Sequence, residues 1–248
     1  SGLARITAEV TNPDTNNTAK YVYGGDLQGN LWRFDLSGQY ITPSLMATLK
    51  DASGKPQSIT TRPEVGQVNN TTVVYVGTGR LLGVTDLQDP ATLQPPGNWS
   101  YVGSLYALAD TGASLGNPRG NASIVKQTFS SFSATQLTAS TNTVSIPSNI
   151  GWYVDFPATG ERVNIDMQLV LGTLLVTTNI PNQNACSAGG DSWLYQFNYG
   201  NGNAVTGAVN GVVATKTVGA LTVGNVVVQL PSQSVKIIST ESSGTKIT

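Results

Sequence analysis

The stretch of sequence that decides the fold is Tyr21–Gly38, YVYGGDLQGNLWRFDLSG. It contains two runs rich in aromatic and β-branched residues, separated by a polar turn with Gly and followed by a second turn with Asp35 and Gly38. Val, Tyr and Phe fit the half-buried surface of a pleated sheet, whereas Asp, Asn and Gly favour tight turns. The stretch therefore predicts a β-hairpin that leads into a further strand.

Runs of this kind recur along the chain, and no amphipathic helix stands out between them. Four runs share a pattern of apolar and aromatic residues followed by a turn with Gly. They begin at Leu31, Leu105, Trp152 and Leu194, at intervals of 74, 47 and 42 residues. The last two intervals match the roughly 40–50 residues of one β-propeller blade. A β-sandwich would fit the number of strands but not these intervals.

The pattern predicts an all-β fold with four to five four-stranded antiparallel blades. Because this number is small for a closed ring, we expect residues 1–248 to form one partial β-propeller domain, a fragment of a longer parent chain. The runs Leu3–Val10 and Val235–Thr240 are expected to stay unpaired at the two ends. Open strand edges of this kind are templates for pairing with another strand.

Composition restricts the class of protein further. The 248 residues include 30 Thr, 22 Ser and 20 Asn, but only 13 basic and 14 acidic residues. A net charge of -1 excludes a basic nucleic-acid-binding surface, and the absence of His excludes Ser-His-Asp triads and His-built metal sites in this chain. No apolar run approaches the roughly 18 residues of a membrane span. The single cysteine, Cys186, has no internal disulfide partner and is expected to be a small, at least partly buried thiol.

Four segments, in order along the chain, resemble the C-terminal propeller of the PilC/PilY family, the tip-associated adhesins of type IV pili. They are YVYGGDLQGNLWRFDLSG (21–38), TRPEVGQV to TVVYVGTGRLLGVTDLQ (61–88) followed by SLYALAD (104–110), GWYVDFPATGERV (151–163) and PNQNACSAGGDSWLYQFNYGNG (181–202). Each segment alone is a weak signal, but four in the same order are a strong one.

The resemblance implies a bacterial protein that is extracellular, at the cell surface or pilus tip. There it would support pilus assembly, oppose retraction, and contribute to adhesion and twitching motility without catalysis. Implied partners are minor pilins or the pilus tip, a host or surface receptor, and the remainder of the parent chain or another copy. An alternative is an excised fragment that self-associates through strand edges into a structural assembly. A quinoprotein dehydrogenase would need a closed ring, a stacked cofactor and calcium, and the sequence points to none of them.

Many members of that family carry an Asp-rich calcium loop just before the first of these segments. The corresponding positions are Asn12, Asp14 and Asn16, with Lys20 where the last carboxylate would stand. One carboxylate, two amides and a lysine are a poor set of ligands for calcium. We therefore expect this loop to be empty, with no cofactor bound. Asp86 and Asp89 are the next candidates, for which a solvated loop is the simpler interpretation.

Other charged residues of the motifs have structural interpretations. Asp26 and Asp35 are expected to cap the turns that they begin. Arg80 and the pair Glu161–Arg162 are expected to bridge carbonyls or a carboxylate between blades.

The proline-rich loop 84–102 is the expected contact surface, through Trp99 and Tyr101. Aromatic side chains on a loop supply a large contact area at low entropic cost. Core packing is the expected role of Trp32, Trp152 and Trp193.

Overall fold

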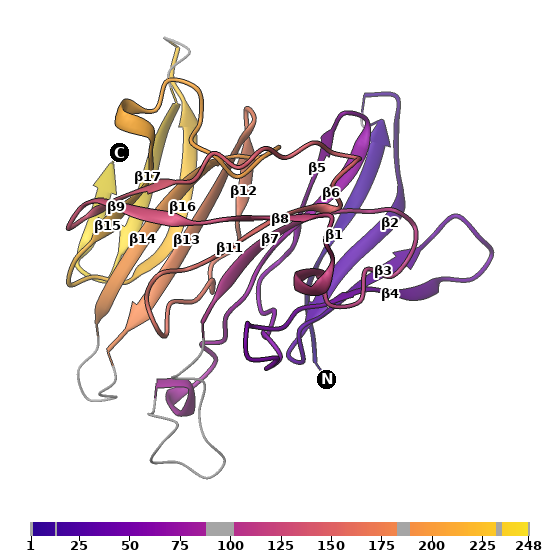
Figure 1. The fold of residues 1–248 in the computed structure, drawn as a ribbon, viewed down its shortest axis with the longest axis horizontal. Helices are drawn as coiled ribbons and strands as arrows, with labels where there is room; N and C mark the ends of the chain where they lie inside the picture. The colour runs from indigo at the N-terminus through magenta and orange to yellow at the C-terminus, as the bar shows by residue number, and fades with distance from the viewer. Residues whose placement is uncertain (1, 13, 88–101, 183–188, 232–234, 248) are drawn as a thin grey trace.

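The computed structural model describes residues 2–12, 14–87, 102–182, 189–231 and 235–247. Strands dominate this part of the chain, with three short 3-10 turns, η1 (Val84–Leu87), η2 (Pro118–Gly120) and η3 (Val209–Gly211). The strands form four sheets that follow one another along the long axis of the molecule (Figure 1). The predicted all-β class is confirmed. Within the described ranges, no helix is long and apolar enough to cross a membrane.

The first two sheets contain most of the N-terminal half. The first sheet is antiparallel and has the order β1 (Leu3–Asn12), β2 (Asn16–Asp26), β3 (Asn30–Asp35), β4 (Thr42–Thr48). The second sheet has the order β5 (Glu64–Val68), β6 (Thr71–Gly77), β7 (Ser104–Ala109), β11 (Gly151–Asp155), β8 (Ile124–Gln127). In it β8 runs parallel to β11.

The other two sheets follow in sequence and in space. The third sheet has the order β12 (Gln168–Val170), β13 (Thr173–Pro181), β14 (Gly190–Asn198), β15 (Val212–Thr217), β10 (Gln136–Ala139), β9 (Phe129–Ser133). The fourth sheet has the order β16 (Thr222–Gln229), β17 (Val235–Glu241), β18 (Gly244–Ile247).

The sheets differ from the predicted uniform blades in three respects. They have four, five, six and three strands, and one pair of strands is parallel. Leu105 and Trp152 belong to neighbouring strands of one sheet, β7 and β11, so the interval of 47 residues between them is not a repeat. The terminal runs are also paired, because β1 pairs with β2, and β17 pairs with both β16 and β18.

The segment between β7 and β11, residues 110–150, is named the strap here because it follows the outer edges of three sheets. Its first part bonds to β4, where the Leu115 amide donates to the Met46 carbonyl and the Thr48 amide donates to the Gly116 carbonyl. Farther on, β8 pairs with β11 of the second sheet, and β10 pairs with β15 of the third. The strap thereby protects three strand edges that would otherwise be free to pair with another chain.

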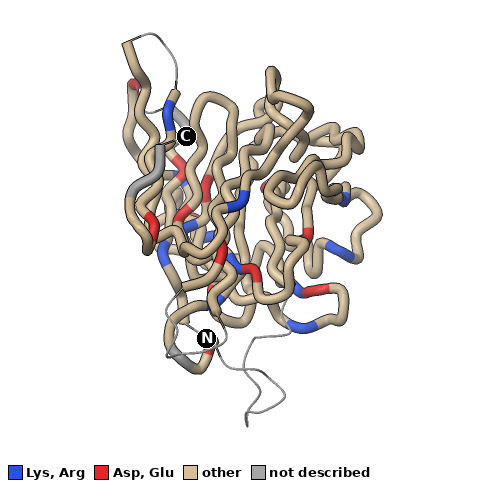
Figure 2. Tube along the Cα trace, turned by 90° about the vertical axis from the view of Figure 1, so that its left-hand side faces the viewer, with Lys and Arg blue, Asp and Glu red and all other residues tan. Residues whose placement is uncertain are grey.

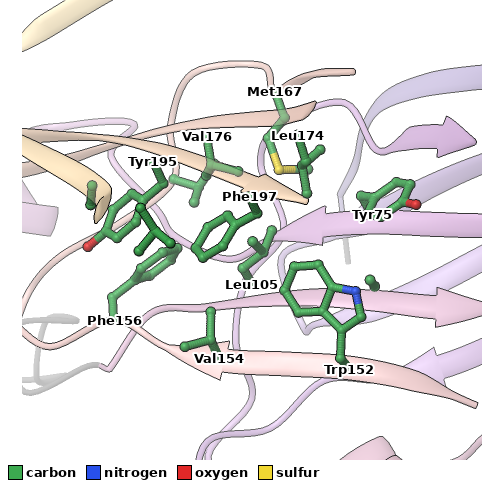
Figure 3. Close-up of a cluster of buried hydrophobic side chains, with 14 of the residues drawn as sticks. Tyr75, Leu105, Trp152, Val154, Phe156, Met167, Leu174, Val176, Tyr195 and Phe197 are labelled. Carbon is green, nitrogen blue, oxygen red and sulfur yellow. The ribbon is translucent and has the colours of Figure 1, made fainter. Parts of the chain in front are cut away.

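The core consists of two clusters, each between neighbouring sheets. Along β6, Val73 and Tyr75 point to the cluster shared with the third sheet, while Val74 and Val76 point to the cluster shared with the first. This alternation follows from the two-residue period of a strand. Aromatic side chains fill the cluster between the second and third sheets (Figure 3), and the rings of Tyr195 and Phe197 stack with centroids 5.6 Å apart. The second sheet is therefore buried on both faces.

The paired glycines of the opening stretch allow this close packing. A Cβ atom on Gly25 would lie 2.2 Å from Cγ2 of Ile59, which is inside the core cluster of the first and second sheets. A Cβ atom on Gly24, on the opposite face, would lie 2.9 Å from Cγ2 of Ile6. Since real contacts of this kind are longer, glycine is required for the strand to lie this close to its neighbours.

Charged residues are few, and the two signs are interspersed along the trace (Figure 2). The described surface also includes exposed large apolar side chains, among them Tyr40, Leu171 and Val209.

Candidate functional site

Two motif loops meet at the junction of the second and third sheets. Arg162, only 1% exposed, donates from Nε to the carbonyl of Gly160 at 2.8 Å. Its Nη1 donates to the carbonyls of Arg80 and Asp86, each at 2.9 Å. Arg162 therefore joins the loop after β11 to the loop after β6 by charge-assisted hydrogen bonds.

The loop after β6 carries an ion pair of its own. Nε of Arg80 lies 2.8 Å from Oδ1 of Asp86, and the amide of Leu82 donates to Oδ2 of the same carboxylate at 2.8 Å. Asp86 is 2% exposed and lies in η1, so it is a buried structural anion and not a residue of a solvated loop. The prediction for Asp86 was wrong, because η1 folds the carboxylate back onto its own loop. Arg80 and Arg162 bind a carboxylate and carbonyls, as the sequence predicts.

Glu161 occupies the other side of the same junction. It is 0% exposed, and its Oε1 accepts hydrogen bonds from the hydroxyls of Thr178 and Tyr195, each at 2.6 Å. The amide of Ala158 donates to its Oε2 at 3.3 Å. Burial raises the pKa of Glu161 to about 7, although these donors favour the charged form. The two adjacent residues thus fix the loop after β11 on both sides, Glu161 to the third sheet and Arg162 to the loop after β6.

The two aspartates of the opening stretch act as turn caps, as predicted. Asp26 is 2% exposed and accepts hydrogen bonds from the amides of Gln28 and Asn30 at 2.9 and 3.0 Å and from the indole of Trp32 at 3.2 Å. These donors lower the pKa of Asp26 against the opposing effect of burial. Asp35 accepts hydrogen bonds from both the amide and the hydroxyl of Ser37.

The predicted calcium-loop positions lie around the turn between β1 and β2. Asn12 pairs with Asn16 at the end of the two strands. The side chain of Asn16 accepts a hydrogen bond from the amide of Thr18 at 3.0 Å, and Asp14 is exposed. Among the residues that the structure describes, no group of three or more His, Cys, Asp or Glu side chains could hold a metal ion.

The remaining predicted residues fall into two groups. Trp99, Tyr101, Asp89 and Cys186 lie outside the described residues. Trp152 and Trp193 are buried in the core, as predicted. Trp32 is only half-buried and lies on the outer face of the first sheet, so its predicted core position was wrong.

A second buried charged group, which the sequence analysis did not predict, is centred on Arg119 of the strap. Its guanidinium forms an ion pair with Asp155, and its Nε donates to the carbonyl of Lys50 at 2.6 Å and to the hydroxyl of Tyr106 at 2.8 Å. It also lies over the ring of Tyr153, 4.5 Å from the centroid. Arg119 therefore connects the strap to the loop after β4 and to the second sheet. The polar stretch around it lacks the pattern of a strand, so no sequence signal marks it.

These features place the chain in a class of all-β proteins. Its sheets pack one after another, and its motif loops are fixed by buried charged side chains. No family model matches the sequence. Among curated proteins, the chain is 27% identical over 231 residues to a type IV pilus biogenesis factor PilY1 homolog of Xylella fastidiosa, covering 85% of the chain and 15% of that protein. A second homolog from this organism is 30% identical over 228 residues, with 79% and 17% covered. PilY1 of Pseudomonas aeruginosa is 28% identical over 232 residues, with 73% and 19% covered.

The fold of the chain is also that of a solved relative. The crystal structure of the Pseudomonas aeruginosa PilY1 C-terminal domain matches with a TM-score of 0.74 and 22% sequence identity, over 99% of this chain and 60% of that domain. The chain is a PilY1-type C-terminal region, and the family resemblance predicted from the four segments is confirmed. It spans about a fifth or less of the length of the curated relatives.

Proposed function

We propose that this chain is the docking part of a type IV pilus-associated protein at the bacterial cell surface. In this role it supports pilus assembly, opposes retraction and contributes to adhesion and twitching motility, without catalysis. The observation that carries the proposal is the colinear relationship to several type IV pilus biogenesis factors over 73–85% of the chain. Pilus components are the proposed partners, with minor pilins or the pilus tip on one side and a surface receptor on the other.

The four sheets are proposed to be consecutive blades of one β-propeller domain. In three consecutive sheets, neighbouring strands follow one another along the chain, as they do in propeller blades. These runs are β1 to β4, β5 to β7, and β12 to β15. The long strap accounts for the extra strands at the outer edges of the second and third sheets. A partial propeller is a rigid scaffold, and its loops are free to carry specificity.

The loop that contains Trp99 and Tyr101 is the proposed contact surface. Its N-terminal root is η1, where Asp86 is held by Arg80 and Arg162. Its C-terminal root is also fixed, because the carbonyl of Val102 accepts a hydrogen bond from the side chain of Gln57 at 2.7 Å. Rigid roots reduce the entropic cost of holding a binding loop in place. The proposal includes no cofactor and no calcium at Asn12, Asp14 and Asn16.

The test is mass spectrometry of pili sheared from the source cells, beside the same fraction from a mutant that lacks the major pilin. We expect peptides of this chain in the sheared fraction of the parent strain and their loss from that of the mutant. Equal amounts in both fractions would mean a surface assembly that does not depend on pili. In that case the relationship to PilY1 would concern fold and ancestry alone.

A further inference from the structure

The strap contains a segment that is unusually rich in hydroxyl side chains. Between residues 128 and 148, 11 of 21 residues are Ser or Thr, compared with 52 of 248 in the whole chain. No charged residue stands between Lys126 and Asp155. Segments that combine many Ser and Thr residues with Pro, here Pro147, are typical acceptors of O-linked sugars. Because such a composition also suits a plain polar surface, the positions of the hydroxyls in the fold decide between the two interpretations.

The β9–β10 hairpin presents several of these hydroxyls to solvent. Ser131, Ser133 and Thr135 are all exposed, on β9 and in the turn that follows it. The hydroxyl of Ser133 accepts a hydrogen bond from the amide of Thr135 at 3.3 Å. Among the described residues, the hydroxyls of Ser131 and Thr135 have no hydrogen-bond partner. The less exposed Ser140 differs, because it donates to the side chain of Gln127 at 2.6 Å. The hairpin therefore carries hydroxyls that the fold itself does not use.

The same hairpin leaves one strand edge uncovered. β9 is the outermost strand of the third sheet and pairs with β10 alone. The outermost strand of the second sheet, β8, is covered farther along the strap, where the side chain of Asn142 donates to the carbonyl of Lys126 at 2.7 Å. Proteins protect open edges with charges, proline, bulges or a covering segment. β9 has neither charge nor proline, and a register shift beside Phe132 is the one such device within it. A bulky hydrophilic group on its side chains would keep another chain from pairing with it.

We propose that the β9–β10 hairpin is a site of O-linked glycosylation, with the hydroxyls of Ser131, Ser133 and Thr135 as acceptors. In the reaction, Oγ of the serine or Oγ1 of the threonine forms a bond to the anomeric carbon of a diphosphate-activated sugar. The bond between that carbon and the diphosphate oxygen breaks, the diphosphate leaves, and a base of the cell's glycosyltransferase takes up the hydroxyl proton. The attached sugars then shield the open edge of β9 from other strands.

The test is mass spectrometry of tryptic peptides of the protein isolated from whole source cells. Lys126 and Arg162 are consecutive cleavage sites, so one peptide, 127–162, contains the whole segment. We expect this peptide to carry the added mass of sugars, and electron-transfer fragmentation to locate them on the hairpin. Because the sample comes from whole cells, the result does not depend on attachment to pili.

The control is peptide 34–50, which also contains exposed hydroxyls, those of Ser37 and Thr42, but is less rich in them. We expect it at its unmodified mass. The proposal would be overturned if peptide 127–162 were found only at its unmodified mass, or if both peptides were modified to the same extent.

Replacing the acceptors gives a second readout. A variant that combines Ser131→Ala, Ser133→Ala and Thr135→Ala, produced in the source cells, should carry several-fold less sugar on peptide 127–162. Ser114→Ala is the matched control, because Ser114 is an exposed serine of the strap outside that peptide, and it should leave the sugar unchanged. An unchanged sugar content in the triple variant would contradict the assignment to the hairpin.

Light scattering of the same two variants tests the shielding of the edge. The triple variant should form more aggregate on concentration than Ser114→Ala, because β9 loses its cover. Equal scattering of the two variants, despite the loss of sugar from one of them, would contradict the shielding role.

Discussion

The adjacent residues Glu161 and Arg162 show two ways in which a charged side chain is accommodated inside this protein. Arg162 donates hydrogen bonds to the carbonyl oxygens around it, and its guanidinium stays protonated because the pKa of arginine is far above neutral pH. Glu161 receives two hydroxyl donors and one amide, and burial still raises its pKa to about 7. The charged form of Glu161 is therefore less stable in the folded protein than in water, whereas its neutral form is not.

This difference predicts a pH dependence of stability. The pKa of Glu161 rises from 4.5 in the unfolded chain to about 7 in the fold, so the folded state binds more protons between these values. The free energy of unfolding should then fall as the pH rises from about 5 to 7, by on the order of 3 kcal/mol in total. The chain contains no His, which would otherwise titrate in this range. Urea unfolding at a series of pH values measures the slope.

Glu161→Gln should keep the acceptor for Thr178 and Tyr195 and flatten this slope. Glu64→Gln is the matched control, because burial also raises the pKa of Glu64 but an ion pair with Arg62 counteracts it. If Glu161→Gln leaves the slope unchanged while Glu64→Gln removes it, the buried carboxyl that titrates is Glu64 and the assignment to Glu161 fails.

At the scale of elements, the strap is the part of the fold that links three sheets, and Arg119 fixes it in place. The side chain of Arg119 is 9% exposed, and its ion pair with Asp155 lies beside the hydroxyl of Ser104, which Nη2 of Arg119 contacts at 2.8 Å. Lys126, on β8 of the same strap, also approaches Asp155, at 3.2 Å. Among the described residues, removing the guanidinium leaves this carboxylate with one cation, Lys126, whose side chain is more exposed.

We predict that Arg119→Met lowers the free energy of unfolding by about 3 kcal/mol, because it breaks a largely buried ion pair. Arg5→Met is the control, since Arg5 also pairs with a carboxylate, that of Asp166, but its side chain is 73% exposed. The control should change stability by less than about 1 kcal/mol. Urea unfolding of the two variants and the parent chain measures both effects. Equal, small losses would mean that the strap is held by its strands alone.

Sequence reasoning succeeds for the hairpin of β2 and β3 and fails for the strands of the strap. The hairpin of β2 and β3 could be predicted, because its turn residues and strand residues lie within one continuous stretch. Asp26 could be assigned to its turn for the same reason, since its partners Gln28, Asn30 and Trp32 are near in sequence. Strands β8, β9 and β10 could not, because they have only four or five residues each and become strands by pairing with β11, β10 and β15, respectively. Such tertiary pairing overrides local propensity.

At the scale of the molecule, the all-β class and the family could be predicted, whereas the number of strands in each sheet could not. The recurring pattern at Leu105 and Trp152 marks two neighbouring strands of one sheet. The interval between them reflects the length of the strap, and not the length of a repeat. Periodicity counts strands of similar composition and does not tell whether two of them share a sheet. The buried junction of Glu161, Thr178 and Tyr195 was similarly out of reach, because its members come from different elements.

The strap has one more consequence, for the behaviour of a nicked chain. A single backbone cut between β10 and β11 would leave β5 to β8 on one fragment and β11 on the other, although all five strands belong to one sheet. The third sheet would be divided in the same way, with β9 and β10 on the first fragment and β12 to β15 on the second. The two fragments are therefore interlaced and should co-elute at the mass of the intact chain, separating only in denaturant. Produced separately, they should reconstitute the fold by complementation.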